Sequence, residues 1–119
     1  MPVMIQTAGL KTKSRGYIKG PDAPVNSVHI RASTLPNPFG KINLSSYHEE
    51  ENIERVKLFL LETSGTKLKT MISKGVDAIQ KGKPLIITCT YGKHRSRAVA
   101  QLIGDKFHPS KVYYVHREG

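Results

Sequence analysis

The chain has 119 residues, a length that fits one domain with a single hydrophobic core. Its one cysteine excludes an internal disulfide and a multi-cysteine metal site, and no apolar run approaches the ~18 residues of a membrane span. Because the first residues also lack a secretory leader pattern, we expect a soluble, cytoplasmic protein that needs no metal and no cofactor.

Basic residues dominate the charge, and they are unevenly distributed. Nineteen Lys and Arg against nine Asp and Glu give a net charge of +10. Residues 1–46 contain six bases and one acid, residues 47–62 two bases and five acids, and residues 63–119 eleven bases and three acids. A basic field of this kind indicates a polyanionic partner such as nucleic acid, while a solvated basic surface without a partner is the alternative.

The N-terminal part of the sequence predicts two strands separated by loops. Residues 3–7 are β-like, and residues 25–30 predict a second strand. The segment between them, residues 8–24, is rich in glycine, proline and basic residues, which predicts a hairpin or a basic arm. Residues 33–46 form a long loop stiffened by two prolines, and long loops in compact domains are usually functional or disordered.

Two helices are expected next, over residues 49–62 and 64–81, because apolar residues recur there at helical spacing. Ser45 or Ser46 can cap the first helix, and its three leading glutamates suit the positive end of the helix dipole. The acidic segment therefore has a structural explanation that involves no metal.

The C-terminal part predicts a strand over residues 83–88, a helix over residues 95–107 and a strand over residues 111–116. Such a strand–helix–strand unit places its two strands parallel. We therefore expect residues 1–119 to form a single α/β domain with a small, mostly parallel sheet of about four strands, covered by about three helices.

The segment Cys89-Thr90-Tyr91-Gly92-Lys93-His94-Arg95-Ser96 connects a predicted buried strand to a predicted helix. Ligands bind at such carboxyl ends of strands in open α/β sheets, and the first amides of a helix favour an anion. Gly92 permits a tight turn, Lys93, His94 and Arg95 add cationic groups, and Ser96 can cap the helix or donate a hydrogen bond. The segment lacks the first glycine and the Lys-Ser/Thr pair of a Walker A loop, so nucleotide hydrolysis by that route is not expected.

The same segment contains Cys89 and Arg95 in a C-x5-R spacing, which resembles the signature of cysteine-dependent phosphatases. In that chemistry the cysteine is a thiolate, activated by the helix N-terminus, that attacks phosphorus. Thr88 and His94 depart from the phosphatase pattern, and Asp22, Asp77 and Asp105 each have an explanation other than general acid. A phosphatase or phosphotransferase therefore remains an alternative function, and a small buried Cys89 that closes the strand is the structural alternative.

The loop, the upstream Leu35-Pro36-Asn37-Pro38 and the terminal Val115-His116-Arg117-Glu118 together resemble the C-terminal domain of the RapZ family of bacterial RNase adapter proteins. The resemblance implies a non-enzymatic role. Domains of this family bind small structured RNAs, sense the phosphosugar glucosamine-6-phosphate, self-associate and present RNA to RNase E. We therefore expect RNA, a phosphorylated small molecule, an RNase and a second copy of the chain as partners, and no membrane.

The resemblance also implies which residues bind. The phosphosugar pocket would comprise Thr90, Gly92, Lys93, His94, Arg95 and Ser96 in the loop, with Arg31, Asn37, Lys11, His116 and Arg117 around it. Basic residues that would contact RNA phosphates are Lys11, Lys13, Arg15, Lys19, the Lys67/Lys69/Lys74 helix face and Arg97.

The sequence departs from the family pattern at several places. Tyr91 replaces a loop glycine, His29 replaces an acidic residue, and Phe39 follows the Pro-Asn-Pro motif where well-known members have His. The family's N-terminal nucleotide-binding domain and basic C-terminal tail are not in this sequence. A stand-alone copy of the domain could also act as a decoy or modulator of a host RNase adapter system, which is a third hypothesis.

Overall fold

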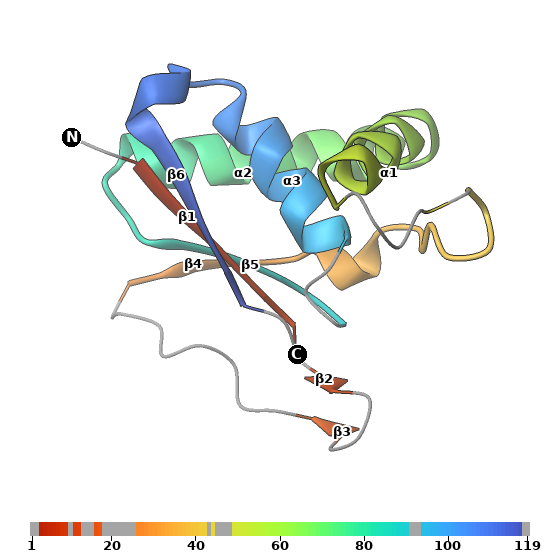
Figure 1. Ribbon diagram of the computed structural model, residues 1–119. Coiled ribbons are helices and arrows are strands. Elements are labelled where there is room, and N and C mark those ends of the chain that lie inside the picture. Colours follow the sequence, from red (N-terminus) through yellow and green to blue (C-terminus); the bar gives the residue numbers. More distant parts are fainter. Residues whose placement is uncertain are drawn as a thin grey trace.

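The computed structural model describes residues 3–9, 11–12, 16–17, 26–42, 44, 49–90 and 94–117. Within these residues a four-stranded sheet has the order β4-β5-β1-β6, and every neighbouring pair of strands is parallel (Figure 1). The described residues also include three α-helices, so the predicted α/β fold is confirmed. A second, two-stranded sheet pairs β2 and β3 antiparallel.

The elements agree with the predicted ranges to within a few residues. The strands are β1 (Val3–Gly9), β2 (Lys11–Thr12), β3 (Gly16–Tyr17), β4 (Val28–Arg31), β5 (Leu85–Cys89) and β6 (Val112–Arg117). The helices are η1 (Ala32–Thr34), α1 (Glu49–Thr63), α2 (Gly65–Gln80), α3 (Arg95–Gly104) and η2 (Pro109–Lys111).

Three predicted boundaries were wrong, each for a local reason. The second large strand begins at Val28 rather than residue 25, because Asn26 has a φ of 70° and leaves the extended region. The last helix ends at Gly104 instead of residue 107, because Lys106 and Phe107 form tight turns onto the carbonyls of Ile103 and Gly104. β1 ends at Gly9 rather than residue 7, while the short antiparallel β2–β3 pair agrees with the hairpin that was one of the two expectations for residues 8–24.

The three α-helices lie together on one side of the sheet, and the β2–β3 pair lies beyond the carboxyl end of β1 (Figure 1). Side chains alternate between the two faces of a strand, so Ile5, Ile30, Leu85 and Ile87 point toward the helices and form the core with them. Val56 and Leu60 from α1, Leu68 from α2 and Val99 from α3 complete that core.

Two glycines in the helical layer are required by its geometry. Gly65 joins α1 to α2 with a φ of +51°, which side chains rarely adopt. Gly75 lies where α2 approaches α3, and a Cβ there would overlap the Cδ1 and Cγ1 atoms of the buried Ile103. Glycine has a low helix propensity at both positions. The positive φ explains Gly65, and the close approach of Ile103 explains Gly75.

The strand order places a topological switch point between β5 and β1. The crossovers from β4 to β5 and from β5 to β6 advance in the same direction across the sheet, and both carry their helices on the same face. The step from β1 to β4 advances in the opposite direction across the sheet. The direction of the connections therefore reverses between the adjacent strands β1 and β5, and in open α/β sheets ligands bind at the carboxyl ends of the strands at such a point.

Candidate anion-binding site

The strand register brings the predicted binding segments to one edge of the sheet. Arg31 pairs with Thr88, Gly9 with Cys89, and Ala8 with Arg117, so the carboxyl ends of all four strands lie side by side. The loop after Cys89 leaves from the middle of this edge, at the switch point. Arg31, the loop and His116 therefore come from different strands to the same end of the domain (Figure 1).

Arg95, the first residue of α3, connects the loop to the segment that follows β4. Its Nη1 atom donates to the carbonyl oxygens of Ser33 at 2.9 Å and Leu35 at 3.0 Å. Its Nη2 atom donates to Thr90 Oγ1 at 3.4 Å. A guanidinium has five N–H donors, so Nε–H and one Nη2–H remain on the edge that can hold two oxygens of an anion.

Cys89 and Ser96 meet beneath the first turn of α3. The Cys89 thiol donates to the Ser96 hydroxyl across 3.2 Å, and the two side chains are 3% and 0% exposed. The residue before the helix is His94, and no side chain caps the helix there. Of the two roles expected for Ser96, the cap on α3 is not seen, because its hydroxyl turns into the core toward Cys89.

His29 and Thr88 form a polar pair on the face of the sheet opposite the helices. His29 Nε2 lies 2.7 Å from Thr88 Oγ1, and Thr88 is buried although His29 is exposed. Partial burial, together with the positive charges of Arg31 and Lys74, lowers the pKa of His29 below its usual 6.5. His29 is thus held neutral at pH 7 unless an anion binds nearby.

His116 is held in place from two sides near the end of β6. Its Nδ1 atom lies 2.6 Å from the hydroxyl of Thr7, which is fully buried on the neighbouring strand β1. Its ring stacks on Tyr114, with centroids 5.7 Å apart and an interplanar angle of 13°. The hydrogen bond between Thr7 and Nδ1 therefore favours one tautomer of the His116 ring.

Asn37 lies in the proline-stiffened segment after η1. Its side-chain oxygen accepts a hydrogen bond from Phe39 N at 3.1 Å, which shapes a turn and leaves Phe39 78% exposed. Arg95 fixes the start of this segment through Leu35, so the Asn37 turn is tied to the loop through one side chain.

Several predicted site residues cannot be placed. Gly92 and Lys93 lie outside the described residues, and so do three predicted RNA-binding residues, Lys13, Arg15 and Lys19. Lys11 and Arg117 are described only as backbone, in β2 and at the end of β6. The described part of the predicted pocket is therefore Arg31, Asn37, Thr90, His94, Arg95, Ser96 and His116.

The basic face predicted on the second helix was partly wrong. Lys67 and Lys74 are seven residues apart, nearly two full turns, so they share one face of α2. Lys69 projects from a different face, since two residues along a helix turn it by more than half a revolution. Arg97 is half-buried near the start of α3.

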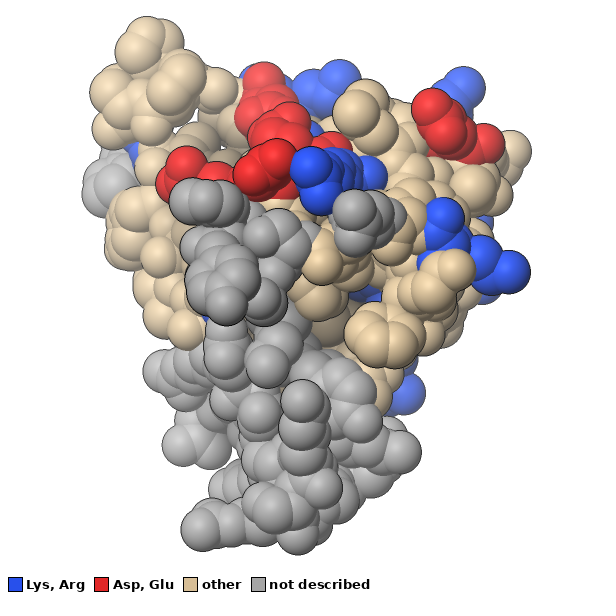
Figure 2. Space-filling view, turned by 45° about the vertical axis from the view of Figure 1, so that its right-hand side comes forward, with Lys and Arg blue, Asp and Glu red and all other residues tan. Residues whose placement is uncertain are grey.

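The acidic segment forms ion pairs on the surface of α1. Glu51 pairs with Arg55 at 2.8 Å, and Lys57 lies 3.2 Å from Glu54 and 3.1 Å from Asp105. On the face shown in Figure 2, acidic side chains gather in the upper part, next to basic ones. Among the described residues no three His, Cys, Asp or Glu side chains come together as metal ligands.

Sequence reasoning did not assign a role to Thr7 or Thr88. Both are polar residues near the carboxyl ends of otherwise apolar strands, and both are fully buried against a histidine. A polar residue at the end of an apolar strand is a pattern that the sequence shows. Their histidine partners lie 109 and 59 residues away, for Thr7 and Thr88 respectively, and only the sheet brings them close.

No protein-family model and no curated protein sequence matches the chain. In the described part of the chain, no helix combines the length and the apolar character that a membrane span needs.

Proposed function

We propose that this chain is a non-enzymatic RNA-binding domain that binds a phosphorylated small molecule at the 89–96 loop, as its resemblance to RNase adapter domains implies. The observation that carries the proposal is the position of Arg95, which contacts the loop at Thr90 and the Pro-Asn-Pro segment at Leu35. Two of the segments that carry the resemblance thus meet at one cation, at the carboxyl edge of a parallel sheet.

The chemistry of this edge suits a phosphate group. The amide groups at the start of α3 carry positive partial charge, and Arg95 offers one guanidinium edge to two oxygens. Arg31 adds a second permanent charge from β4, and His116 adds a ring nitrogen from β6. The net charge of +10 supplies the long-range attraction for a polyanion such as RNA.

The first experiment measures phosphosugar binding by isothermal titration calorimetry. We expect Arg31→Gln to weaken binding by about tenfold, the order expected for one charge-assisted hydrogen bond. Arg55→Gln is the matched control, because Arg55 is also an arginine at the surface, half-exposed, but lies on α1 and pairs with Glu51. Equal affinity of both variants and the wild type would contradict a phosphate site at this edge.

A second experiment tests the RNA partner by fluorescence anisotropy of a labelled RNA hairpin at two salt concentrations, with duplex DNA as control. Salt-sensitive binding that prefers RNA, and that phosphosugar alters, supports the adapter function. Weak and equal binding to both nucleic acids would mean that the charge is a solvated surface.

One observation favours a second candidate, a cysteine-dependent phosphatase. The Ser96 hydroxyl, 3.2 Å from the Cys89 sulfur, can rotate to donate its proton and stabilise a thiolate. The two described aspartates lie at the far end of the domain, however: Asp105 follows the C-terminus of α3, and Asp77 pairs with Lys81 on α2. Turnover of an aryl phosphate that Cys89→Ser abolishes would establish this function, whereas equally inert wild-type and variant proteins would exclude it.

A further inference from the structure

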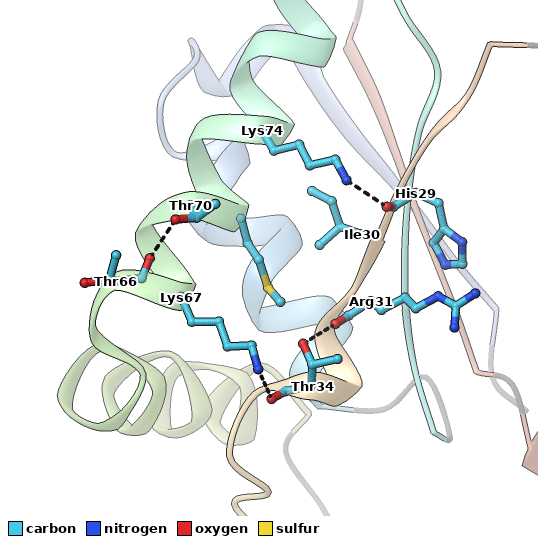
Figure 3. A pocket seen from close by; sticks show the side chains of 9 residues that line it. His29, Ile30, Arg31, Thr34, Thr66, Lys67, Thr70 and Lys74 are labelled. Atoms are coloured by element: carbon cyan, nitrogen blue, oxygen red, sulfur yellow. Dashed lines mark hydrogen bonds between the residues drawn. The ribbon is translucent and has the colours of Figure 1, made fainter.

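A groove lies between one face of α2 and the outer edge of β4 (Figure 3). Its volume is about 510 Å³, which is within the range of small-molecule sites. The described residues that line it come from β4, η1 and α2, and none of them belongs to the described part of the 89–96 loop. The groove shares only Arg31 with the candidate site described above.

The wall on the β4 side is the outer edge of the sheet, where side chains bond to backbone carbonyl groups of the strand. Val28 N–H bonds to Pro84 O at 2.8 Å, and alternate residues of a strand face the same neighbour. The backbone groups of His29 and Arg31 therefore point outward, away from β5. Their side chains point away from α2, so they contribute backbone to the groove (Figure 3).

Both outward carbonyl groups are occupied by donors from this chain. Lys74 Nζ lies 3.5 Å from His29 O, and the Thr34 hydroxyl donates to Arg31 O at 2.9 Å. An incoming β-strand needs these acceptors as well as the N–H groups, so this edge is poorly suited to strand pairing. What it presents outward is the pair of N–H donors of His29 and Arg31.

The wall on the α2 side adds positive charge. Lys67 and Lys74 lie on the same face of the helix, and Lys67 Nζ donates to Thr34 O at 3.1 Å. Each ammonium has three donors and uses one on the carbonyl groups of the opposite wall. Thr66 and Thr70 lie beside them, and Ile30 and Met71 give the groove an apolar part. Among the described residues, no acidic side chain lines it.

We propose that this groove binds the phosphate group of a phosphorylated organic ligand. Two ammonium groups and two outward peptide N–H groups are donors that a phosphate accepts from, and none of the described lining residues is a carboxylate that would compete with it. The volume exceeds that of a bare phosphate, and Ile30 and Met71 can contact the organic part. The inference rests on described residues of β4, η1 and α2, and it uses no residue of the 89–96 loop.

Backbone amide NMR on the full chain tests the proposal with inorganic phosphate, ribose 5-phosphate and oligouridylate as probes, against chloride at equal ionic strength. We expect saturable shifts of the His29 and Arg31 amides. Shifts confined to residues near Arg95 would support the loop site and overturn the groove. Shifts at His29 and at the α2 residues that line the groove, without shifts near Arg95, would support the groove and count against the loop.

Matched lysine variants identify the groove donors. The double variant Lys67→Gln, Lys74→Gln should weaken binding at the His29 and Arg31 amides at least about tenfold, whereas Lys69→Gln, on another face of the same helix, should not. The dispersion of the same spectra reports whether each variant is folded. Equal shifts in the double variant and the wild type would overturn the proposal, and the lysines would then serve only to protect the edge of the sheet.

The three probes distinguish the source of the phosphate. Equal affinity for ribose 5-phosphate and for oligouridylate per phosphate indicates a small phosphorylated ligand. Much tighter and strongly salt-dependent binding of oligouridylate indicates the backbone of a nucleic acid strand. Linear, unsaturated shifts with all three probes would mean an adventitious ion only, and would refute the site.

Discussion

The guanidinium of Arg95 lies 3.0 Å from the carbonyl oxygen of Leu35, so that the first residue of α3 holds the start of the Pro-Asn-Pro segment. The same nitrogen also reaches Ser33 O at 2.9 Å. A side chain that was expected to bind only an anion is thus also a structural clamp between two segments.

Replacing Arg95 with lysine should therefore reduce stability as well as anion binding. A lysine keeps the charge but cannot donate to Ser33, Leu35 and Thr90 together. We expect Arg95→Lys to lower the free energy of unfolding by about 1–3 kcal/mol in urea denaturation, the range for hydrogen bonds from a charged donor. Arg55→Lys, which can keep the exposed pair with Glu51, should change it by less than about 0.5 kcal/mol. Equal effects of both substitutions would contradict the clamp.

Thr7 should act on the site through His116. Thr7→Val removes the hydroxyl 2.6 Å from His116 Nδ1 and keeps most of the volume of the buried side chain. We expect the His116 ring to lose its fixed tautomer, which ¹⁵N chemical shifts of the ring nitrogens report directly. Thr66→Val, an exposed threonine of α2, is the control. Unchanged ring shifts in Thr7→Val would show that the hydroxyl of Thr7 does not set the tautomer of the histidine.

His29 should make stability depend on pH in a defined direction. Partial burial and the charges of Arg31 and Lys74 lower its folded-state pKa below 6.5, so the unfolded chain binds a proton more readily. The contribution of His29 to the free energy of unfolding is present above about pH 6.5, and it is lost as the pH falls through the folded-state pKa.

Urea denaturation of the wild type and His29→Gln at pH 7.5 and pH 5 measures this contribution. We expect the wild type to have a higher free energy of unfolding than His29→Gln at pH 7.5. This difference should be smaller at pH 5. An advantage that grows on acidification would mean that a partner stabilises the protonated ring. NMR titration of the ring protons gives the pKa independently.

Gly75 should be required by packing. Alanine is normally the better helix residue by about 1 kcal/mol, but here its Cβ would overlap the Ile103 side chain. We expect Gly75→Ala to lower the free energy of unfolding by about 1–3 kcal/mol, the cost of overpacking. Ile103→Val removes the Cδ1 atom and should relieve part of that cost. A double-mutant cycle without coupling would exclude the clash as the cause.

The helix junction at Gly65 gives a further stability test. Its φ of +51° is the left-handed conformation, which costs an L-residue with a Cβ roughly 1–2 kcal/mol. Gly65→Ala should therefore lower the denaturation midpoint, and Gly65→Asn should lower it less, because asparagine tolerates this region better. Equal midpoints for wild type and Gly65→Ala would show that the junction can relax.

Local patterns in the sequence determined much of this protein. Apolar residues at helical spacing in residues 49–62 and 64–81, and the apolar run Leu85 to Ile87, predicted the helices and the central strand, because each pattern depends only on near neighbours. The 89–96 segment was predicted as a strand-to-helix loop for the same reason, since β5 ends at Cys89 and α3 begins at Arg95. Lys69 could also have been separated from Lys67 and Lys74 by helical periodicity alone.

Tertiary structure decided the strand order β4-β5-β1-β6, and with it the switch point between β1 and β5. It also decided the partners of Arg95, Thr7 and Thr88, and the donor-rich edge of β4. These features join residues about 45 to 109 positions apart in the chain, and no local pattern records them. Hydrogen bonds of that kind form only after the hydrophobic core has set the register of the sheet.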